Sequence, residues 1–257
     1  MPRTPETRPL YDEPSWYNRI FRERKHDVEH YLTLAETAPP GHILELGVGA
    51  GRVAIPLARS GRHIDGVDLS KPMLSSCEKR LELEAETVRG RLRLHCMDGA
   101  LFHGEQPYAL ALIPFNGIAH QHSPGSLKAY LQNAHEQLTP DGCLALDFLK
   151  VDPERLRGGV AEIPWLEDPL LGVPARATET VRYERDTKTF HIETQIRPMK
   201  GDAQPRTLTL RLRQWSHHEV AEILNALDGS PSVQRVDLGD SHAYIARRNG
   251  KPSAARK

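Results

Sequence analysis

The sequence lacks most features of a disulfide-stabilised, membrane-spanning or nucleic-acid-binding protein. Its 257 residues include only three cysteines, without metal-ligand spacing, so we expect reduced thiols, no metal site and a cytoplasmic location. No apolar run approaches the ~18 residues that span a bilayer, and the first ten residues lack the apolar core of a secretion signal. The 34 basic and 34 acidic side chains balance, so net charge predicts neither a nucleic-acid nor a membrane partner.

One stretch, ILELGVGAGR at residues 43–52, organises the chain. Its apolar residues lead into glycines at 47, 49 and 51. A helical pattern then ends at Gly61, and the run HIDGVDLS follows. Strand, glycine turn, helix and strand are the opening βαβ unit of a doubly wound α/β sheet, which binds its ligand at the turn.

The spacing of the glycines disfavours a nicotinamide or flavin dinucleotide. Those ligands go with G-x-G-x-x-G, whereas the pattern here is G-x-G-x-G, one residue shorter. Glu45 lies two residues before the first glycine, and Asp68 closes the next predicted strand. These two acids suit a ligand that has a cationic amino-acid end and a ribose but no phosphate.

The stretch resembles the first motif of class I S-adenosylmethionine (SAM) methyltransferases, E/D-x-G-x-G-x-G, and GVDLS resembles their second. The phrase LTPDGCLALD, residues 138–147, extends the resemblance to about residue 150. The resemblance implies SAM as the cofactor and an acid after the third strand that faces the adenine amino group. The cofactor-binding residues that it implies are Tyr17, Glu45, Gly47, Gly49, Gly51, Arg52, Asp68, Leu69, Met73, Met97, Asp98, Gly99, Pro114 and Phe115.

The whole chain is similar in plan to small-molecule methyltransferases such as sugar-amine and glycine N-methyltransferases. The plan is a seven-stranded doubly wound sheet with an N-terminal helical lid and an antiparallel β insertion, which serves as an acceptor lid or a dimer surface. We expect a lid segment, a SAM-binding core, the β insertion, the C-terminal part of the core and a tail, at residues 1–40, 41–150, 151–214, 215–250 and 251–257.

Local patterns predict several elements and two irregular regions. Residues 1–14, rich in proline and charge, are expected to be disordered or loosely draped, and the proline- and glycine-punctuated stretch after residue 150 to be irregular. The segments TETVRYERD, KTFHIETQIRP and RTLTLRLRQW alternate with period 2, which predicts an antiparallel meander. Ser70 and Ser216 are predicted helix N-caps.

The loop after the fourth strand, IPFNGIAHQH, lies where transferase chemistry is placed in this architecture. His120 is the candidate catalytic residue because a neutral imidazole can accept a proton near pH 7. The alternative for His120 is a structural role, in which backbone contacts hold the imidazole. The alternative for the aromatic candidates is that they only pack against the sheet. The candidate substrate-binding residues are Tyr11, Tyr17, Asn116, His120, Phe148 and Trp215.

The resemblance implies transfer of a methyl group to a small-molecule acceptor, with an amine nitrogen favoured. Two alternatives stay open: an O-methyltransferase acting on a hydroxyl or carboxyl metabolite, and a SAM-binding scaffold that has lost catalysis. The sequence IPFNG departs from the D/N-P-P-Y loop of many nucleic-acid methyltransferases. The expected partner is therefore the small acceptor, without nucleic acid or membrane, and a homodimer is left open.

Overall fold

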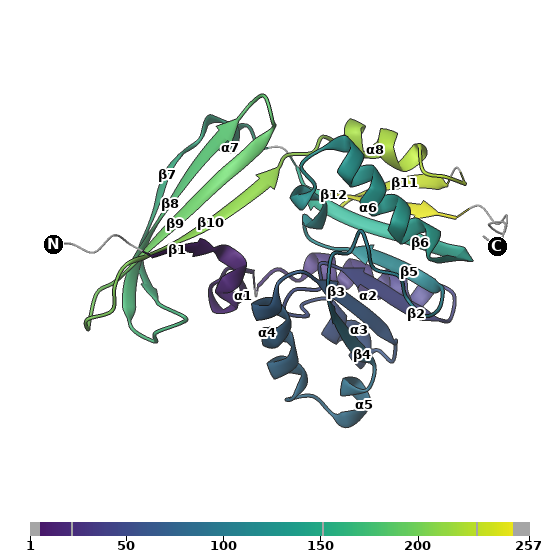
Figure 1. Cartoon of the computed structure of the whole chain (residues 1–257), viewed down its shortest axis with the longest axis horizontal. Helices are drawn as coiled ribbons and strands as arrows, with labels where there is room; N and C mark the ends of the chain where they lie inside the picture. The colour runs from purple at the N-terminus through teal and green to yellow at the C-terminus, as the bar shows by residue number, and fades with distance from the viewer. Residues whose placement is uncertain (1–5, 22, 151, 230, 249–257) are drawn as a thin grey trace. The chain divides into compact units, whose positions relative to one another are not determined.

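The computed structural model describes residues 6–21, 23–150, 152–229 and 231–248. The chain divides into two compact units. The larger comprises Arg24–Lys150 and Trp215–Lys257, and the smaller comprises Met1–Glu23 and Val151–Gln214. Each unit has its own β-sheet (Figure 1). Each also has its own hydrophobic core.

A seven-stranded sheet forms the centre of the larger unit, in the order β11-β12-β6-β5-β2-β3-β4. The strands β2 to β6 run parallel to one another, and β12 and β11 are antiparallel to their neighbours. The predicted seven-stranded doubly wound sheet is thereby confirmed. Its strands are β2 (His42–Leu46), β3 (Ile64–Asp68), β4 (Leu92–Cys96), β5 (Tyr108–Ile113), β6 (Leu138–Leu149), β11 (Ser232–Asp237) and β12 (Ser241–Arg247).

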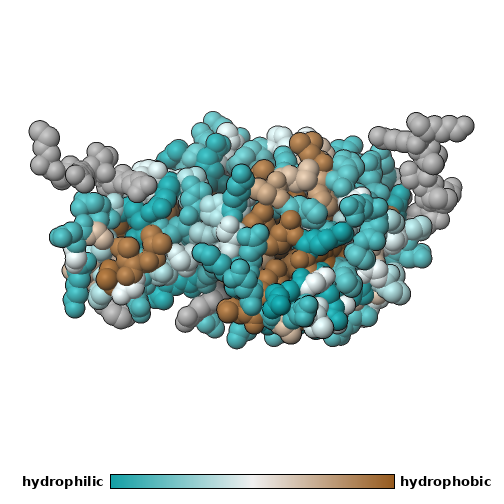
Figure 2. Space-filling model, turned by 60° about the horizontal axis from the view of Figure 1, so that its bottom comes forward, coloured by the Kyte–Doolittle hydropathy of each residue, from teal (hydrophilic) through white to brown (hydrophobic). Residues whose placement is uncertain are grey.

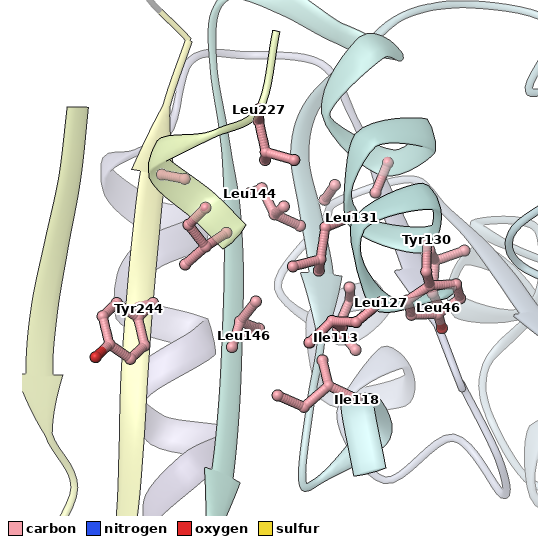
Figure 3. Packing of buried hydrophobic residues seen from close by; sticks show 14 of the residues in the cluster. Leu46, Ile113, Ile118, Leu127, Tyr130, Leu131, Leu144, Leu146, Leu227 and Tyr244 are labelled. Carbon is pink, nitrogen blue, oxygen red and sulfur yellow. The ribbon is translucent and has the colours of Figure 1, made fainter. Parts of the chain in front are cut away.

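Alternate residues of the central strands point to opposite faces of this sheet and build two cores. On one face, Leu44 and Ile113 pack with helices α6 and α8, and Figure 3 shows Leu127 of α6 beside Ile113. On the other face, Ile43 and Leu112 pack with α2, α3 and α4. Helices on both faces explain the uninterrupted apolar run of β5. The helices are α2 (His26–Thr37), α3 (Ala54–Arg59), α4 (Lys71–Leu81), α5 (Glu86–Arg89), η2 (Gly117–His120), α6 (Pro124–Glu136) and α8 (His217–Asn225).

Two helices begin with the caps that the sequence predicts. At α4, the Ser70 hydroxyl accepts the N–H of Met73 at 3.3 Å, and Pro72 lies in the first turn. At α8, Ser216 and Glu219 each accept the other's backbone N–H, at 3.3 and 3.1 Å. Both N-cap predictions are confirmed, because a cap depends on residues only three positions apart.

The smaller unit is a five-stranded sheet in the order β1-β10-β9-β8-β7. Its predicted alternation is confirmed, since Phe190, Ile192, Thr194 and Ile196 are all buried on β9. Leu10 and Trp16 pack with Ile196 in its core. The elements are β1 (Glu6–Pro9), η1 (Leu10–Asp12), α1 (Pro14–Phe21), α7 (Pro153–Arg157), β7 (Gly159–Glu167), β8 (Pro174–Glu184), β9 (Thr189–Pro198) and β10 (Arg206–Arg213).

Two expectations about irregular structure are wrong for the described residues; residues 1–5 and the predicted tail at 251–257 lie outside them. Residues 6–9 form β1, which pairs in parallel with β10, and η1 and the start of α1 complete the span up to residue 14. Residues 159–167 form β7, which pairs with β8. Proline and charged residues interrupt the apolar alternation in both strands, so local patterns do not predict them. Each strand is instead stabilised by hydrogen bonds to a partner strand elsewhere in the sequence.

A buried ion cluster ties the N-terminal segment to the sheet of the smaller unit. The Arg206 guanidinium donates to both carboxylate oxygens of Glu13, at 2.7 and 2.5 Å, and to both of Asp168, at 2.6 and 2.8 Å. Glu13 directly precedes α1, and Asp168 follows β7. Because a buried charge is costly without a partner, this cluster fixes α1 and the turn after β7 against β10.

Candidate functional site

The predicted cofactor residues of the larger unit converge at one edge of its sheet. Because β2, β3, β4 and β5 are parallel, their carboxyl ends lie at the same edge. The glycine turn, Asp68, Asp98 and Pro114 lie at or directly after these ends. Doubly wound sheets bind ligands where the strand order reverses, which here lies between β2 and β5.

Glycine is required at different positions of the turn for different physical reasons. All three have positive φ, +77° at Gly47, +53° at Gly49 and +74° at Gly51. A Cβ on Gly51 would lie 2.5 Å from the Cys77 sulfur, whereas a Cβ on Gly47 would meet nothing within 4 Å. Gly51 therefore serves close packing of the turn on α4, while Gly47 leaves space in front of the backbone.

Asp68, at the end of β3, braces the glycine turn. Its Oδ2 accepts the N–H of Gly49 at 2.8 Å, and its Oδ1 accepts the N–H of Ser70 at 2.8 Å. Burial raises the pKa of Asp68, although these backbone N–H groups oppose the shift. Each carboxylate oxygen keeps a further lone pair, so Asp68 can also accept two hydroxyl groups of a ribose.

Glu45, in β2, is a buried acid with an unused acceptor. Its side chain is only 2% exposed, and Oε2 has no hydrogen-bond partner among the described residues. Burial raises the pKa of Glu45 to about 8; the Arg52 charge opposes this shift, and Asp27 adds to it. Such a group binds a cationic ligand well, because the ligand supplies the missing donor and the opposite charge.

The residues expected around an adenine differ in exposure. On a surface that is largely hydrophilic with a few apolar patches (Figure 2), Leu69 is 70% exposed and Met97 is 37% exposed. Asp98 accepts the N–H of Ala100 through Oδ1 at 2.8 Å. Met73 is buried, with its methyl group 3.2 Å from the Cβ position of Gly49, so it packs behind the glycine turn.

Together these residues fit SAM. Asp68 has acceptor capacity for a ribose diol, and Gly47 leaves room for a ligand along the turn. The unpartnered Oε2 of Glu45 matches an ammonium group. Exposed Leu69 and Met97 offer apolar faces to a base. The spacing of the glycines is compatible with several ligands. The buried acceptor of Glu45 and the open backbone at Gly47 are what favour SAM among them.

The β5 loop carries Phe115 and Asn116 in left-handed backbone conformations, with φ of 44° and 62°. Two guanidinium groups lie over the Phe115 ring, those of Arg24 at 4.4 Å and Arg52 at 5.2 Å from its centroid. Contacts of this kind are favourable because the face of an aromatic ring is negative. A non-glycine residue in the left-handed backbone conformation is strained, and such strained residues are frequent at functional sites.

Behind this ring lies a network of charges that sequence reasoning missed. Arg52 donates to both oxygens of Asp27, at 2.7 and 2.6 Å, and Arg24 donates to Asp27 at 3.3 Å and to Asp240 at 2.5 Å. Burial would raise the pKa of Asp27, but Arg52 and Arg24 outweigh it and lower the pKa. The charged side chains are thus paired, and Arg52 is held on Asp27.

His120 lies at the end of η2 with an exposed side chain, and His122 follows it. Desolvation by the surrounding protein and the charge of His122 lower the pKa of His120 to about 4. With a pKa of about 4, His120 is neutral at pH 7. It can accept a proton there, though as a weaker base than an ordinary imidazole.

The other candidate substrate-binding residues do not form one group in the larger unit. Phe148 is 1% exposed and Trp215 is 2% exposed in the core over α6 and α8, and the Trp215 indole donates to the Ile118 carbonyl. Their burial favours packing, and contact with an acceptor stays a prediction. Tyr11 and Tyr17 belong to the smaller unit, with ring centroids 5.8 Å apart, so their part in the site also stays a prediction.

The described residues contain neither a candidate metal site nor a candidate membrane-spanning helix. His26 and His30 are one helical turn apart on α2, yet no group of three or more His, Cys, Asp or Glu side chains there could hold a metal ion. None of the helices in those residues is long and apolar enough to cross a membrane.

Comparison with known proteins points to one class. Residues 43–142 match the family model described as "Methyltransferase domain". The CcbJ methyltransferase from Streptomyces caelestis is similar in structure, with a TM-score of 0.71, 23% identity and coverage of 88% of this chain and 96% of that one. For SAM-bound CalS10 from Micromonospora echinaspora, the TM-score is 0.69, the identity 18% and the coverage 90% and 96%.

The fold thus agrees with that of class I SAM-dependent methyltransferases, the class that the sequence resembles. Residues 43–142 match the methyltransferase domain family, and CalS10, a neighbour of similar fold, is SAM-bound. A Geobacillus sp. (strain WCH70) protein, provisionally named a methyltransferase, is 30% identical over 78 residues. That match covers 28% of this chain and 32% of the relative, so the chain spans about a third of the length of the curated relative it matches.

Proposed function

We propose that the whole chain transfers the methyl group of SAM to a small-molecule acceptor, and that the acceptor atom is an amine nitrogen. The observation that carries the proposal is the arrangement of Glu45, Gly47 and Asp68 at the switch point of the sheet. It joins a buried acceptor for a cation, an open backbone and a carboxylate suited to a ribose. SAM has no phosphate, so the shorter G-x-G-x-G turn is sufficient for it.

In this proposal each side chain of the larger unit has one task toward the cofactor. Asp68 accepts the ribose hydroxyls, and Glu45 pairs with the ammonium group of the methionine end. Asp98 accepts from the adenine amino group, while Leu69 and Met97 cover the faces of the ring. Bound SAM supplies an activated methyl group on a sulfonium, so alignment of the acceptor accounts for much of the catalysis.

The acceptor lone pair forms the new bond to the methyl carbon while the carbon–sulfur bond breaks and sulfur keeps the electron pair. A neutral amine becomes a methylated ammonium cation in this step, and the cation then releases one proton to His120 or water. Phe115, Asn116 and His120 are the proposed contacts on the β5 loop. For the acceptor side we propose that the lid and the insertion, residues 1–40 and 151–214, select the substrate.

The name of one solved structure supports nitrogen as the acceptor atom, and that of another gives a substrate that carries an amine. CalS10 is named an amino pentose methyltransferase, and MtfA a glycopeptide N-methyltransferase. MtfA in complex with sinefungin is 19% identical to this chain, with a TM-score of 0.58. The match covers 86% of this chain and 92% of the MtfA chain. At such identities the likeness supports the fold, and the acceptor class is carried over only as a hypothesis. An O-methyltransferase and a non-catalytic SAM-binding scaffold are the alternatives.

The test is methyl transfer from labelled SAM to a panel of amino sugars, amino acids and matched hydroxyl compounds. Transfer to amines with no transfer to the hydroxyl analogues supports the proposal. Transfer confined to hydroxyl or carboxyl compounds would replace it with the O-methyl alternative. SAM binding by calorimetry without transfer to any compound of a broad panel would favour the scaffold.

A further inference from the structure

Asp147 of β6 holds both left-handed residues of the β5 loop. Its Oδ1 accepts the N–H of Phe115 at 2.7 Å, and its backbone carbonyl accepts the N–H of Asn116 at 2.9 Å. The same Oδ1 also accepts the Tyr31 hydroxyl of α2 at 2.6 Å. One fully buried residue therefore joins β6, α2 and the loop that follows β5.

The conformation that Asp147 holds is strained. Phe115 and Asn116 are two of the three non-glycine residues with positive φ among the described residues, and they are adjacent. Such a conformation costs free energy and persists only where its surroundings determine it. The bond from Phe115 to the Asp147 side chain is sequence-dependent, whereas any residue at 147 could accept the N–H of Asn116 through its backbone.

The second carboxylate oxygen of Asp147 has a different environment. Oδ2 accepts no hydrogen bond from the described residues, and Arg24 lies 3.8 Å from it. Arg24 also lies over the Phe115 ring, so it contacts the loop as well as Asp147. The structure thus separates two contributions of Asp147: the position of Oδ1, which holds the loop, and the negative charge near Arg24.

We propose that Asp147 is a positioning residue of the methyltransferase site, acting through the position of Oδ1 on the loop from Pro114 to His120. This inference rests on the proposed function, because the loop matters only if Phe115 and Asn116 border the cofactor and the acceptor. Asp147 itself is 0% exposed, so we assign it no direct contact with either ligand. Its effect on the reaction passes entirely through the loop backbone.

Two substitutions separate geometry from charge. Asp147→Asn keeps an acceptor oxygen in place without the charge, and SAM affinity and kcat are expected within about threefold of the parent. Asp147→Glu keeps the charge but displaces the oxygen by one methylene, and we expect a tenfold or larger loss in SAM affinity or kcat, since misplacement of about 1 Å can cost up to about 10²-fold. An impaired Asn variant beside an unimpaired Glu variant would overturn the proposal, as would two variants that both match the parent.

Asp65→Ala is the matched control for lost stability. Asp65 is a buried acid of the same sheet, bonded to Arg93, His95 and Tyr108, none of which belongs to the proposed site. Its loss should lower the melting temperature and leave the SAM dissociation constant unchanged. If Asp65→Ala weakened SAM binding as much as Asp147→Glu, general destabilisation would explain both and the inference would fail. A parent protein that binds no SAM would instead contradict the proposed function.

Discussion

Gly49 of the glycine turn donates its backbone N–H to Oδ2 of Asp68, 2.8 Å away. The residue expected to bind the ribose therefore also shapes the turn along which we expect the ligand to lie. The contact links the ends of β2 and β3, which are neighbours in the sheet. A substitution at Asp68 should consequently affect the cofactor twice, through the lost ribose contacts and through a looser turn.

Asp68→Ala should weaken SAM binding by about two orders of magnitude or more, because hydrogen bonds to a charged acceptor contribute roughly 1.5–3 kcal/mol each. Calorimetric titration of SAM measures the effect, with Asp65→Ala of the same strand as the control. NADH should give no signal above background with the parent protein. An Asp68→Ala variant with the parent's SAM affinity would contradict the assignment of the ribose site.

Glu45 should make apo-protein stability fall as the pH rises. Its pKa is about 8 in the folded chain and 4.5 as the ordinary value, so between these values the folded state holds a proton that the unfolded state has lost. The unfolding free energy therefore decreases with pH across this window. Thermal melting at several pH values should show a shallower decline for Glu45→Gln, which cannot ionise. Equal declines would contradict the raised pKa.

The same acid should couple SAM binding to proton release. A cationic methionine end favours the carboxylate form of Glu45, so SAM affinity should rise between pH 5.5 and 7, by up to about tenfold per unit. Calorimetry in two buffers of different ionisation enthalpy measures the released proton. Glu45→Gln should bind SAM more weakly and without this pH dependence. A parent affinity that does not change with pH would count against the pairing of Glu45 with the ammonium group.

Arg206→Ala should destabilise the smaller unit by roughly 3–5 kcal/mol, because it leaves Glu13 and Asp168 buried without their partner. Arg211→Ala is the control, since this arginine is exposed on the same strand and its loss should change stability by about 0.5 kcal/mol or less. Denaturant unfolding followed by tryptophan fluorescence reports the change through Trp16 of that core. Similar costs for the two variants would contradict the role of the buried cluster.

The pH dependence of this cluster follows from Asp168. Burial opposes ionisation, but the Arg206 hydrogen bond and charge lower the pKa of Asp168 below its ordinary value of 3.8. The stabilisation is therefore present above pH 3.8 and is lost as the pH falls further. Arg206→Ala should not show this loss, so the stability difference between the two proteins should narrow in acid.

The sequence predicted the parts of the molecule that depend on neighbours along the chain. The glycine turn, the caps at Ser70 and Ser216 and the strand Tyr108–Ile113 are local patterns, and the structure confirms them. The strands at residues 6–9 and 159–167 were missed because their partners are distant in sequence. Pairing across a sheet leaves no periodic signal when proline and charge interrupt the strand.

The charge network at Phe115 could not be predicted for the same reason. Arg24, Asp27, Arg52, Asp147 and Asp240 come from separate parts of the sequence and meet only in the folded unit. Weak signals existed: Arg24 and Asp27 are spaced i,i+3 at the start of a helix, and Asp147 closes the phrase LTPDGCLALD. Neither indicates a partner, because spacing describes a face of one element and not what lies against it.

If His120 accepts the proton of the acceptor, His120→Ala should lower kcat by about 10²-fold or more and leave SAM affinity within a few fold. The base is the neutral imidazole, so the parent rate should fall as the pH drops through the pKa of about 4, and stay independent of this group above about pH 5. His122→Ala, two residues further along the loop, should have the smaller effect. Single-turnover rates with a saturating amine acceptor measure both variants. Near-full turnover in His120→Ala would mean that catalysis here depends on alignment alone and that the histidine belongs to the scaffold.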